Sequence, residues 1–415
     1  MLDVAALCLV VTALLAYVNH RFLRLPATIG VMAIALLISL AIVGLHALGI
    51  DHGVKAYEES LLRAIDFSDV LMQGMLSFLL FAGALHVDLG TLKRYRWQIA
   101  ALAIVGTCLS TVLVGGVLWW VLPWVGVPLP FIHCLLFGAL ISPTDPISVM
   151  GILKSIGAPK SLELVIAGES LFNDGVGVVI FSLLVGVAAS GTVPTGHEVG
   201  MLLLQEAGGG LAFGLALGWV TYWLLKSIDQ YQVEVLLTLA AVMGGYALAT
   251  HLHVSGPLAM VVVGLMVGNG ARAEAMSDTT RRYIDMFWEL LDEMLNAVLF
   301  VLIGMEVLVI AFSPALFMGM TTAILVTLLA RLVTVGLPVA ALSGLFRLPA
   351  GSWRVLTWGG LRGGISVALA FSLAPGPGRD TVLGLTYGVV VFSVLVQGLT
   401  VGKVAEAVCK EPLKA

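Results

Sequence analysis

Long apolar runs, separated by short polar loops, divide this sequence from end to end. A helix needs about 20 predominantly apolar residues to cross the hydrocarbon core of a bilayer. Only 11% of the 415 residues are charged, whereas a soluble domain has about 25%. The pattern predicts an all-α polytopic membrane protein. We mark off about 13 transmembrane helices, at approximately 3–19, 27–47, 62–83, 97–122, 131–153, 161–189, 201–225, 232–251, 256–270, 284–311, 315–342, 353–373 and 382–407.

The distribution of basic residues tests this division. When the loops are numbered alternately, 16 of the 21 lysines and arginines fall on one side. The other side holds only Lys55, Arg63 and Arg379, while Arg331 and Arg362 fall inside spans. Because cytoplasmic loops carry the excess of lysine and arginine, we expect the N-terminus outside and the C-terminus in the cytoplasm. A bacterial inner membrane is the expected location.

An odd number of spans permits an inverted repeat. The chain is expected to form one transmembrane transporter domain, 1–415, with repeats at approximately 1–189 and 232–407 and a linker helix at 201–225. The second repeat then starts from the opposite side of the membrane, as in many secondary transporters. The fifth span of each repeat is interrupted by glycine or proline. Paired interruptions of this kind predict crossed broken helices around a midplane binding site.

The first interruption carries a carboxylate, in the segment SPTDP. Pro143 and Pro146 each remove a backbone donor and disfavour helical geometry in the preceding residue. The helix is therefore expected to unwind around Thr144 and Asp145, which frees carbonyl oxygens beside a carboxylate as ligands for a hard cation. The alternative is a proline-kinked helix in which Asp145 only caps the second half.

The next span carries four polar residues close together. Ser170 and Asp174 share one helix face, and Glu169 and Asn173 share the adjacent face. An acid at the centre of a span costs roughly 2.5–3.5 kcal/mol, so a chain that keeps several acids there is expected to use them. A carboxylate, an amide carbonyl and a hydroxyl suit a small alkali cation. The Asp174 carboxylate can take a proton instead, and this competition is sufficient for exchange; a structural ion pair is the alternative.

Two arginines lie inside spans and need counter-charges. Arg331 is expected to pair with a buried acid, and Glu169 is the available partner; direct ion binding by Glu169 is the alternative. Arg362 lies in the glycine-rich interruption at 359–364 and is expected to neutralise helix C-terminal ends at the crossing.

Three acids, Glu289, Asp292 and Glu293, lie near the cytoplasmic start of the tenth span, just after Arg281 and Arg282. They are interpreted as a solvated helix end, with a cation-attracting funnel as the alternative.

Several segments, in order, resemble one family. GESLFNDGVGVVIF resembles the span that carries the Asn-Asp motif of the cation:proton antiporter-1 family, the NhaP and NHE-type sodium/proton exchangers. SPTDPISVMGILK resembles its Thr-Asp-Pro break, GGLRGGISVAL its Gly-Gly-Leu-Arg-Gly segment and LLARLVTV its arginine-bearing span. The resemblance extends over essentially the whole chain. It implies an NhaA-like antiporter fold and a prokaryotic transport core.

The resemblance also implies roles for residues. A homodimer with elevator-like alternating access is expected, in which Asp174 binds both Na⁺ and the proton. Ser170, Thr144 and Asp145 would add oxygens to the Na⁺ site. Asn173 stands where electrogenic relatives carry a second aspartate, which implies electroneutral exchange of one cation per proton.

One position departs from the family pattern. Some members carry an acid after the phenylalanine of the third span, where this chain has Ala82. Fewer acids are then left to gather or coordinate the ion.

The predicted function is secondary active exchange of Na⁺ for H⁺, in the service of pH homeostasis. Ligand types do not separate Na⁺ from Li⁺ or K⁺. The alternatives are a cation channel, a non-transporting ion sensor, or an intramembrane aspartyl hydrolase using Asp145 and Asp174. The hydrolase needs a Gly-x-Gly-Asp segment, whereas this chain has Asn-Asp-Gly-Val-Gly, and neither HExxH nor GxxxxGK[ST] occurs. We therefore expect no enzyme, no cofactor and no nucleic-acid partner.

Overall fold

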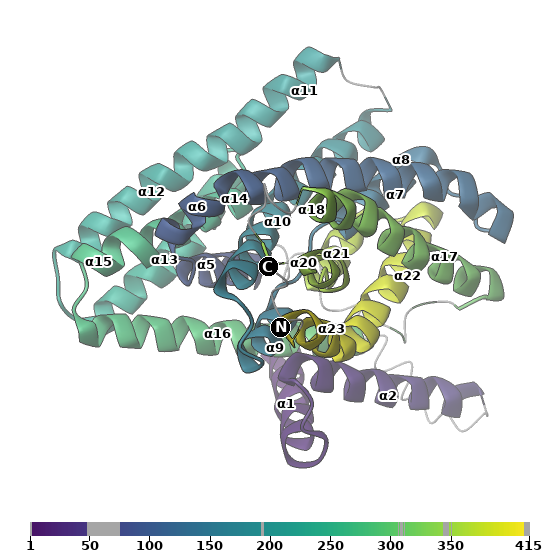
Figure 1. The fold of residues 1–415 in the computed structure, drawn as a ribbon, viewed down its shortest axis with the longest axis horizontal. Helices are drawn as coiled ribbons and strands as arrows, with labels where there is room; N and C mark the ends of the chain where they lie inside the picture. The colour runs from purple at the N-terminus through teal and green to yellow at the C-terminus, as the bar shows by residue number, and fades with distance from the viewer. Residues whose placement is uncertain are drawn as a thin grey trace.

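The computed structural model describes residues 2–47, 75–191, 195–305, 307, 310, 312–342, 348–349 and 351–410. All regular structure in these residues is helical (Figure 1). Eight helical segments in the described part are long and apolar enough to cross a membrane, and three shorter apolar helices accompany them. The exact number of spans stays a prediction, and the expected span 62–83 lies outside the described residues up to residue 74.

One group of helices packs around α14 and α16. α14 (Gly256–Met266) lies between α5 (Leu76–Leu85), α12 (Gly209–Lys226) and α13 (Tyr231–His251). α16 (Asp278–Met305) contacts α2 (Ala27–Ala47), α5, α13 and α1 (Leu2–Val18). The short helix α11 (Gly196–Leu203) continues through a π-helical turn into α12. α15 (Arg272–Glu274) links α14 to α16.

Glycines at helical spacing explain how closely α14 is packed. Added Cβ atoms at Gly264 and Gly268 would meet the backbone of α5, and added Cβ atoms at Gly210 and Gly214 would meet the backbone of α14 and the serine before it. Small residues four apart let helix backbones approach in a membrane, where van der Waals contact drives association. The sequence pattern GLMVG therefore fixes one face of α14 against α5.

A second group of helices contains both interruptions. α7 (Thr107–Val121) packs on α8 (Phe131–Ile141), and α10 (Lys160–Ser190) packs on α8. α17 (Pro314–Arg331) packs on α22 (Pro377–Phe392), which contacts α21 (Gly364–Phe371). Helices α6 (Leu89–Ala100), α9 (Ile147–Ser155), α18 (Leu337–Ala341), α20 (Ser352–Trp358) and α23 (Gly398–Lys410) complete the described elements.

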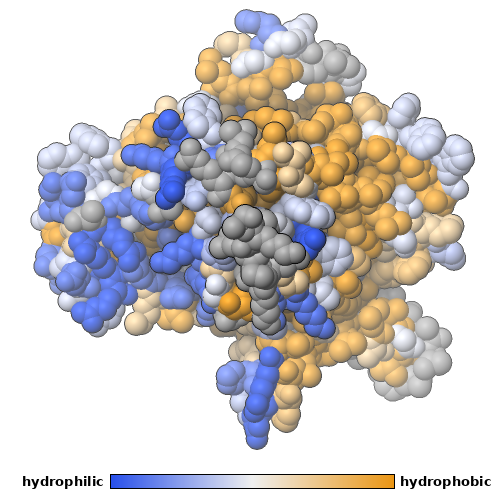
Figure 2. All heavy atoms as spheres, in the orientation of Figure 1, coloured by the Kyte–Doolittle hydropathy of each residue, from blue (hydrophilic) through white to orange (hydrophobic). Residues whose placement is uncertain are grey.

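The outer surface is apolar over large areas. Figure 2 shows hydrophobic residues over much of the right of the view and hydrophilic residues at the left, where α15 and the start of α16 lie. Exposed side chains include Trp119, Trp120 and Trp124 on α7 and the turn after it, and Trp219 and Trp223 on α12. Exposed apolar surface on this scale fits lipid contact, and tryptophans are enriched where a membrane meets water.

Candidate ion-binding site

The two interruptions meet through their backbones. α8 ends at Ile141 and α9 begins at Ile147, and α20 ends at Trp358 before α21 begins at Gly364. Between them, the Asp145 amide donates to the Leu361 carbonyl over 2.8 Å. An added Cβ at Gly363 would collide with the Asp145 side chain. The glycine-rich sequence therefore allows the carboxylate of one interruption to lie against the backbone of the other.

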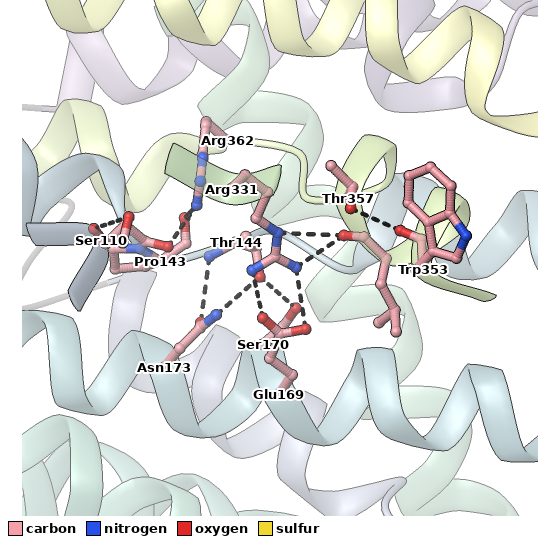
Figure 3. A network of polar contacts seen from close by, with 12 residues as sticks. Ser110, Pro143, Thr144, Glu169, Ser170, Asn173, Arg331, Trp353, Thr357 and Arg362 are labelled. Carbon is pink, nitrogen blue, oxygen red and sulfur yellow. Dashed lines mark hydrogen bonds and ion pairs between the residues drawn. The ribbon is translucent and has the colours of Figure 1, made fainter. Parts of the chain in front are cut away.

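Thr144 lies at the centre of a buried polar cluster. Its side-chain oxygen accepts from the Asn173 amide over 2.9 Å and lies 2.9 Å from the Ser170 hydroxyl. Its backbone amide donates to the side-chain oxygen Oδ1 of Asn173 over 3.3 Å. All three residues are at most 2% exposed. Figure 3 shows that Ser170 and Asn173 rise from one side of α10 toward the interruption, although the spacing in the sequence placed them on two adjacent faces of the helix.

α10 reaches the interruption because a glycine faces the proline ring. An added Cβ at Gly177 would overlap the ring of Pro143. Ser142 steadies the other side of the segment, since its hydroxyl donates to the Ser110 hydroxyl over 2.9 Å. These contacts hold α8, α10 and the SPTDP segment in one arrangement.

Asp174 is buried beside this cluster, with 7% of its surface exposed. Among the described residues, none donates a hydrogen bond or forms an ion pair to its carboxylate. The charge of Asp145 is close enough to repel it. A buried carboxylate without a donor is unfavourable as an anion, so this position favours a bound cation or a proton.

Glu169, on the adjacent face of α10, is held differently. Arg331 donates to its two carboxylate oxygens over 2.5 and 3.1 Å. The same guanidinium donates to the Leu356 carbonyl over 3.2 and 3.1 Å. An added Cβ at Gly360 would meet this guanidinium. The forked geometry satisfies both partners inside the protein (Figure 3), which ties α10 and α17 to the end of α20.

Arg362 occupies the second interruption and reaches the first. Its guanidinium donates to the carbonyl oxygens of Ser142 and Pro143 over 2.5 and 2.8 Å. These carbonyls follow the C-terminal end of α8, where the helix dipole is negative. The Arg362 amide donates to the Ser393 hydroxyl over 2.8 Å. The side chain is therefore placed to offset the partial negative charge of the broken helix.

Comparisons with known proteins identify the family. Residues 10–407 match the model of the transmembrane sodium/hydrogen exchanger family. The chain belongs to this family. It is 54% identical over 410 residues to a Na⁺/H⁺ antiporter NhaP of Pseudomonas aeruginosa, covering 97% of this chain and 96% of the relative. It is 36% identical to a Na⁺/H⁺ antiporter NhaH of Halobacillus dabanensis, covering 91% of this chain and 94% of the relative.

The fold of this exchanger-family chain also has a solved counterpart. The sodium proton antiporter MjNhaP1 of Methanocaldococcus jannaschii superposes with a TM-score of 0.73, covering 98% of each chain at 21% identity. The chain is therefore an all-helical polytopic integral membrane protein with an MjNhaP1-like fold. The family is one of transporters, so the protein is not an enzyme.

Some features of the exchanger-family site had no clear sequence signal. Ser110 and Ser393 supply hydroxyls to the two interruptions, yet serines in apolar spans are common. Gly177, which faces the Pro143 ring, was visible only as a small residue. Gly360 and Gly363 were expected in the interruption at 359–364, but their contacts with the Arg331 guanidinium and the Asp145 side chain were not. Ala82 is buried in α5 and supplies no carboxylate. The candidate site thus offers two carboxylates beside hydroxyl and amide oxygens.

Proposed function

We propose that the protein exchanges Na⁺ for H⁺ across the membrane, with both ions competing for the Asp174 carboxylate. The observation that carries this proposal is the buried, undonated Asp174 carboxylate beside the Thr144, Ser170 and Asn173 cluster. Relatives named as Na⁺/H⁺ antiporters match over nearly the full chain, which supports the same two ions here.

The competition follows from charge. With Na⁺ bound, the carboxylates of Asp174 and Asp145 and the oxygens of Ser170 and Thr144 replace water around the cation. Without it, the two neighbouring carboxylates repel each other, and taking up a proton at Asp174 relieves that repulsion. Because one carboxylate serves both ions in turn, movement of one ion is coupled to movement of the other.

Glu169 and Arg331 act as scaffold in this proposal. Glu169 already forms a buried ion pair with Arg331. Binding Na⁺ at Glu169 would leave the Arg331 charge buried without its counter-ion, which is strongly destabilising. Arg362 fixes the broken helix by binding carbonyls of the first interruption. Neither arginine is required to change its protonation during transport.

Asn173 limits the stoichiometry. Its side-chain nitrogen donates to the Thr144 hydroxyl and its side-chain oxygen accepts from the Thr144 backbone amide. An amide takes up no proton at neutral pH. We infer that one proton is exchanged per Na⁺, which makes the cycle electroneutral. Li⁺ and K⁺ offer the same charge, and competition assays with each will rank them.

At the level of the assembly, we propose a homodimer in a bacterial inner membrane, with the N-terminus outside and the C-terminus in the cytoplasm. The two repeats, 1–189 and 232–407, are proposed to be inverted and to carry the crossed interruptions. Transport would proceed by elevator-like movement of the helices that hold the interruptions against the group around α14 and α16. Mass determination in detergent tests the dimer.

A direct experiment tests the function. Purified protein in liposomes that contain a pH-sensitive dye should move protons when Na⁺ is added, and Asp174→Ala should abolish the response. Folding of the variant is checked by thermal unfolding in detergent. Glu163→Gln, which removes a carboxylate from the first turn of the same helix, should leave the response intact. Normal transport by folded Asp174→Ala protein would refute the proposed site.

A further inference from the structure

A second carboxylate faces the interruptions from α16. Asp292, Asn296 and Leu299 are spaced four and three residues apart, so they lie along one face of the helix. An added Cβ at Gly364 would meet the Leu299 side chain, and α16 contacts α21. The face that carries Asp292 is therefore directed toward the site, which differs from the solvated helix end expected from the sequence.

Asp292 is held in a defined position there. The Asn296 amide donates to an Asp292 carboxylate oxygen over 3.1 Å and to its backbone carbonyl over 2.9 Å. Asn296 is only 2% exposed, while Asp292 is half-buried. The Asp292 charge is close enough to that of Asp145 for the two to repel. The Asp292 carboxylate is thus partly accessible to solvent and lies within electrostatic reach of Asp145.

The helix that carries Asp292 is anchored away from the interruptions. The buried Trp288 indole donates to the Thr238 hydroxyl of α13 over 3.1 Å, and its ring centroid lies 4.5 Å from that of Phe81 in α5. Asp292 therefore belongs to the group around α14 and α16, whereas Asp145 and Asp174 belong to the group with the interruptions. A cation that passes from Asp292 to Asp174 crosses between the two groups.

We propose that Asp292 recruits the cation on one face of the membrane and delivers it to Asp145 and Asp174. This inference rests on the proposed function. The face concerned is the one from which α16 begins, directly after α15. α15 lies beside the end of α12 there, because the Tyr222 hydroxyl donates to the Glu274 carboxylate over 2.8 Å. The destination is the Asp174 carboxylate, 7% exposed and without a donor among the described residues. A negative charge at the mouth of a path raises the local cation concentration and speeds entry.

The test is sided transport by Asp292→Asn in vesicles of known orientation. Presented on the face of α15, Na⁺ should show an apparent KM raised by about fivefold or more, with the maximal rate within about twofold of wild type. From the opposite face the KM should not change. Glu293→Gln is the matched control, because it removes an exposed carboxylate from the next position of the same helix. Asp292→Glu should restore most of the affinity.

Four outcomes separate the possibilities. An unchanged KM for folded Asp292→Asn protein at both faces would overturn the inference, and so would an equal rise at both faces. If Asp292→Asn unfolds, Asp292→Ser and Asp292→Glu carry the test, and a wild-type KM in the serine variant refutes the inference. If wild-type protein moves no protons on addition of Na⁺, the proposed function fails instead, and that result is visible before any variant is compared.

Discussion

Two neighbouring acids of α10 have opposite surroundings. Glu169 is bound by a guanidinium at both oxygens, whereas Asp174, five residues on, has no donor in the described residues. Both side chains are at most 7% exposed. A buried charge is stable only when paired. We therefore propose that Glu169 keeps its ion pair throughout transport, whereas Asp174 binds and releases Na⁺ or a proton in each cycle.

Replacement of Glu169 by glutamine separates scaffold from ligand. The variant leaves the Arg331 charge buried without its counter-ion, and breaking such a pair costs about 3–5 kcal/mol. We expect a clear fall in the thermal unfolding temperature in detergent, measured beside Glu163→Gln as a control on the same helix. Unchanged stability together with a weaker apparent affinity for Na⁺ would instead indicate a direct ligand.

Asn173 offers a test of the coupling ratio. In wild-type protein, the steady-state exchange rate should not change when a membrane potential is imposed. A concentration gradient of a permeant anion sets that potential. Asn173→Asp adds a second carboxylate that can take up a proton, so its rate should respond to the potential. A potential-dependent wild-type rate would contradict electroneutral exchange.

At the scale of the helices, the sequence predicts where the chain must break more readily than how the breaks are held. Pro143 and Pro146 each remove a backbone donor and disrupt helical geometry. In the structure the helix ends at Ile141, where α8 stops, and resumes at Ile147, where α9 begins. The partners are set by tertiary packing: the Leu361 carbonyl and the Ser110 hydroxyl carry no local signal. The direction of the Asp292 face was likewise fixed only by its contact with α21.

The approach of α10 to the first interruption gives an element-scale prediction. Gly177→Ala places a methyl group against the Pro143 ring, and overpacking of this kind costs about 1–3 kcal/mol. We expect α10 to move away from the Pro143 ring, which carries Ser170 and Asn173 away from Thr144. The result should be a large loss of Na⁺-driven proton movement. Gly186→Ala in the same helix, where nothing lies within 4 Å of the added methyl, should transport normally. Equal behaviour of the two variants would contradict this account.

At the scale of the molecule, the described helices pack around the interruptions and around α14 and α16, and buried apolar residues join the two sets. The family and the all-helical fold follow from composition and four ordered motifs. The number of spans stays a prediction, because α16 carries charges along much of its length and the two broken helices are each too short to stand as one span. Inverted repeats therefore remain a proposal on topology.

Membrane orientation is testable with single cysteines. On a background without the four native cysteines, His197→Cys and Ser227→Cys place exposed thiols at opposite ends of the α11–α12 segment. In right-side-out vesicles, an impermeant thiol reagent should label the first directly and the second only after permeabilisation. The reverse pattern would invert the proposed topology.

The glycines at the crossing have a consequence for protein engineering. A methyl group added at any of four glycines would displace a neighbouring side chain. The side chains are the Pro143 ring at Gly177, the Arg331 guanidinium at Gly360, the Asp145 carboxylate at Gly363 and Leu299 at Gly364. The crossing has no spare volume at these four points. Attempts to change ion preference there are best directed at the chemistry of Ser170 or Asn173, where one oxygen can replace another at nearly constant size.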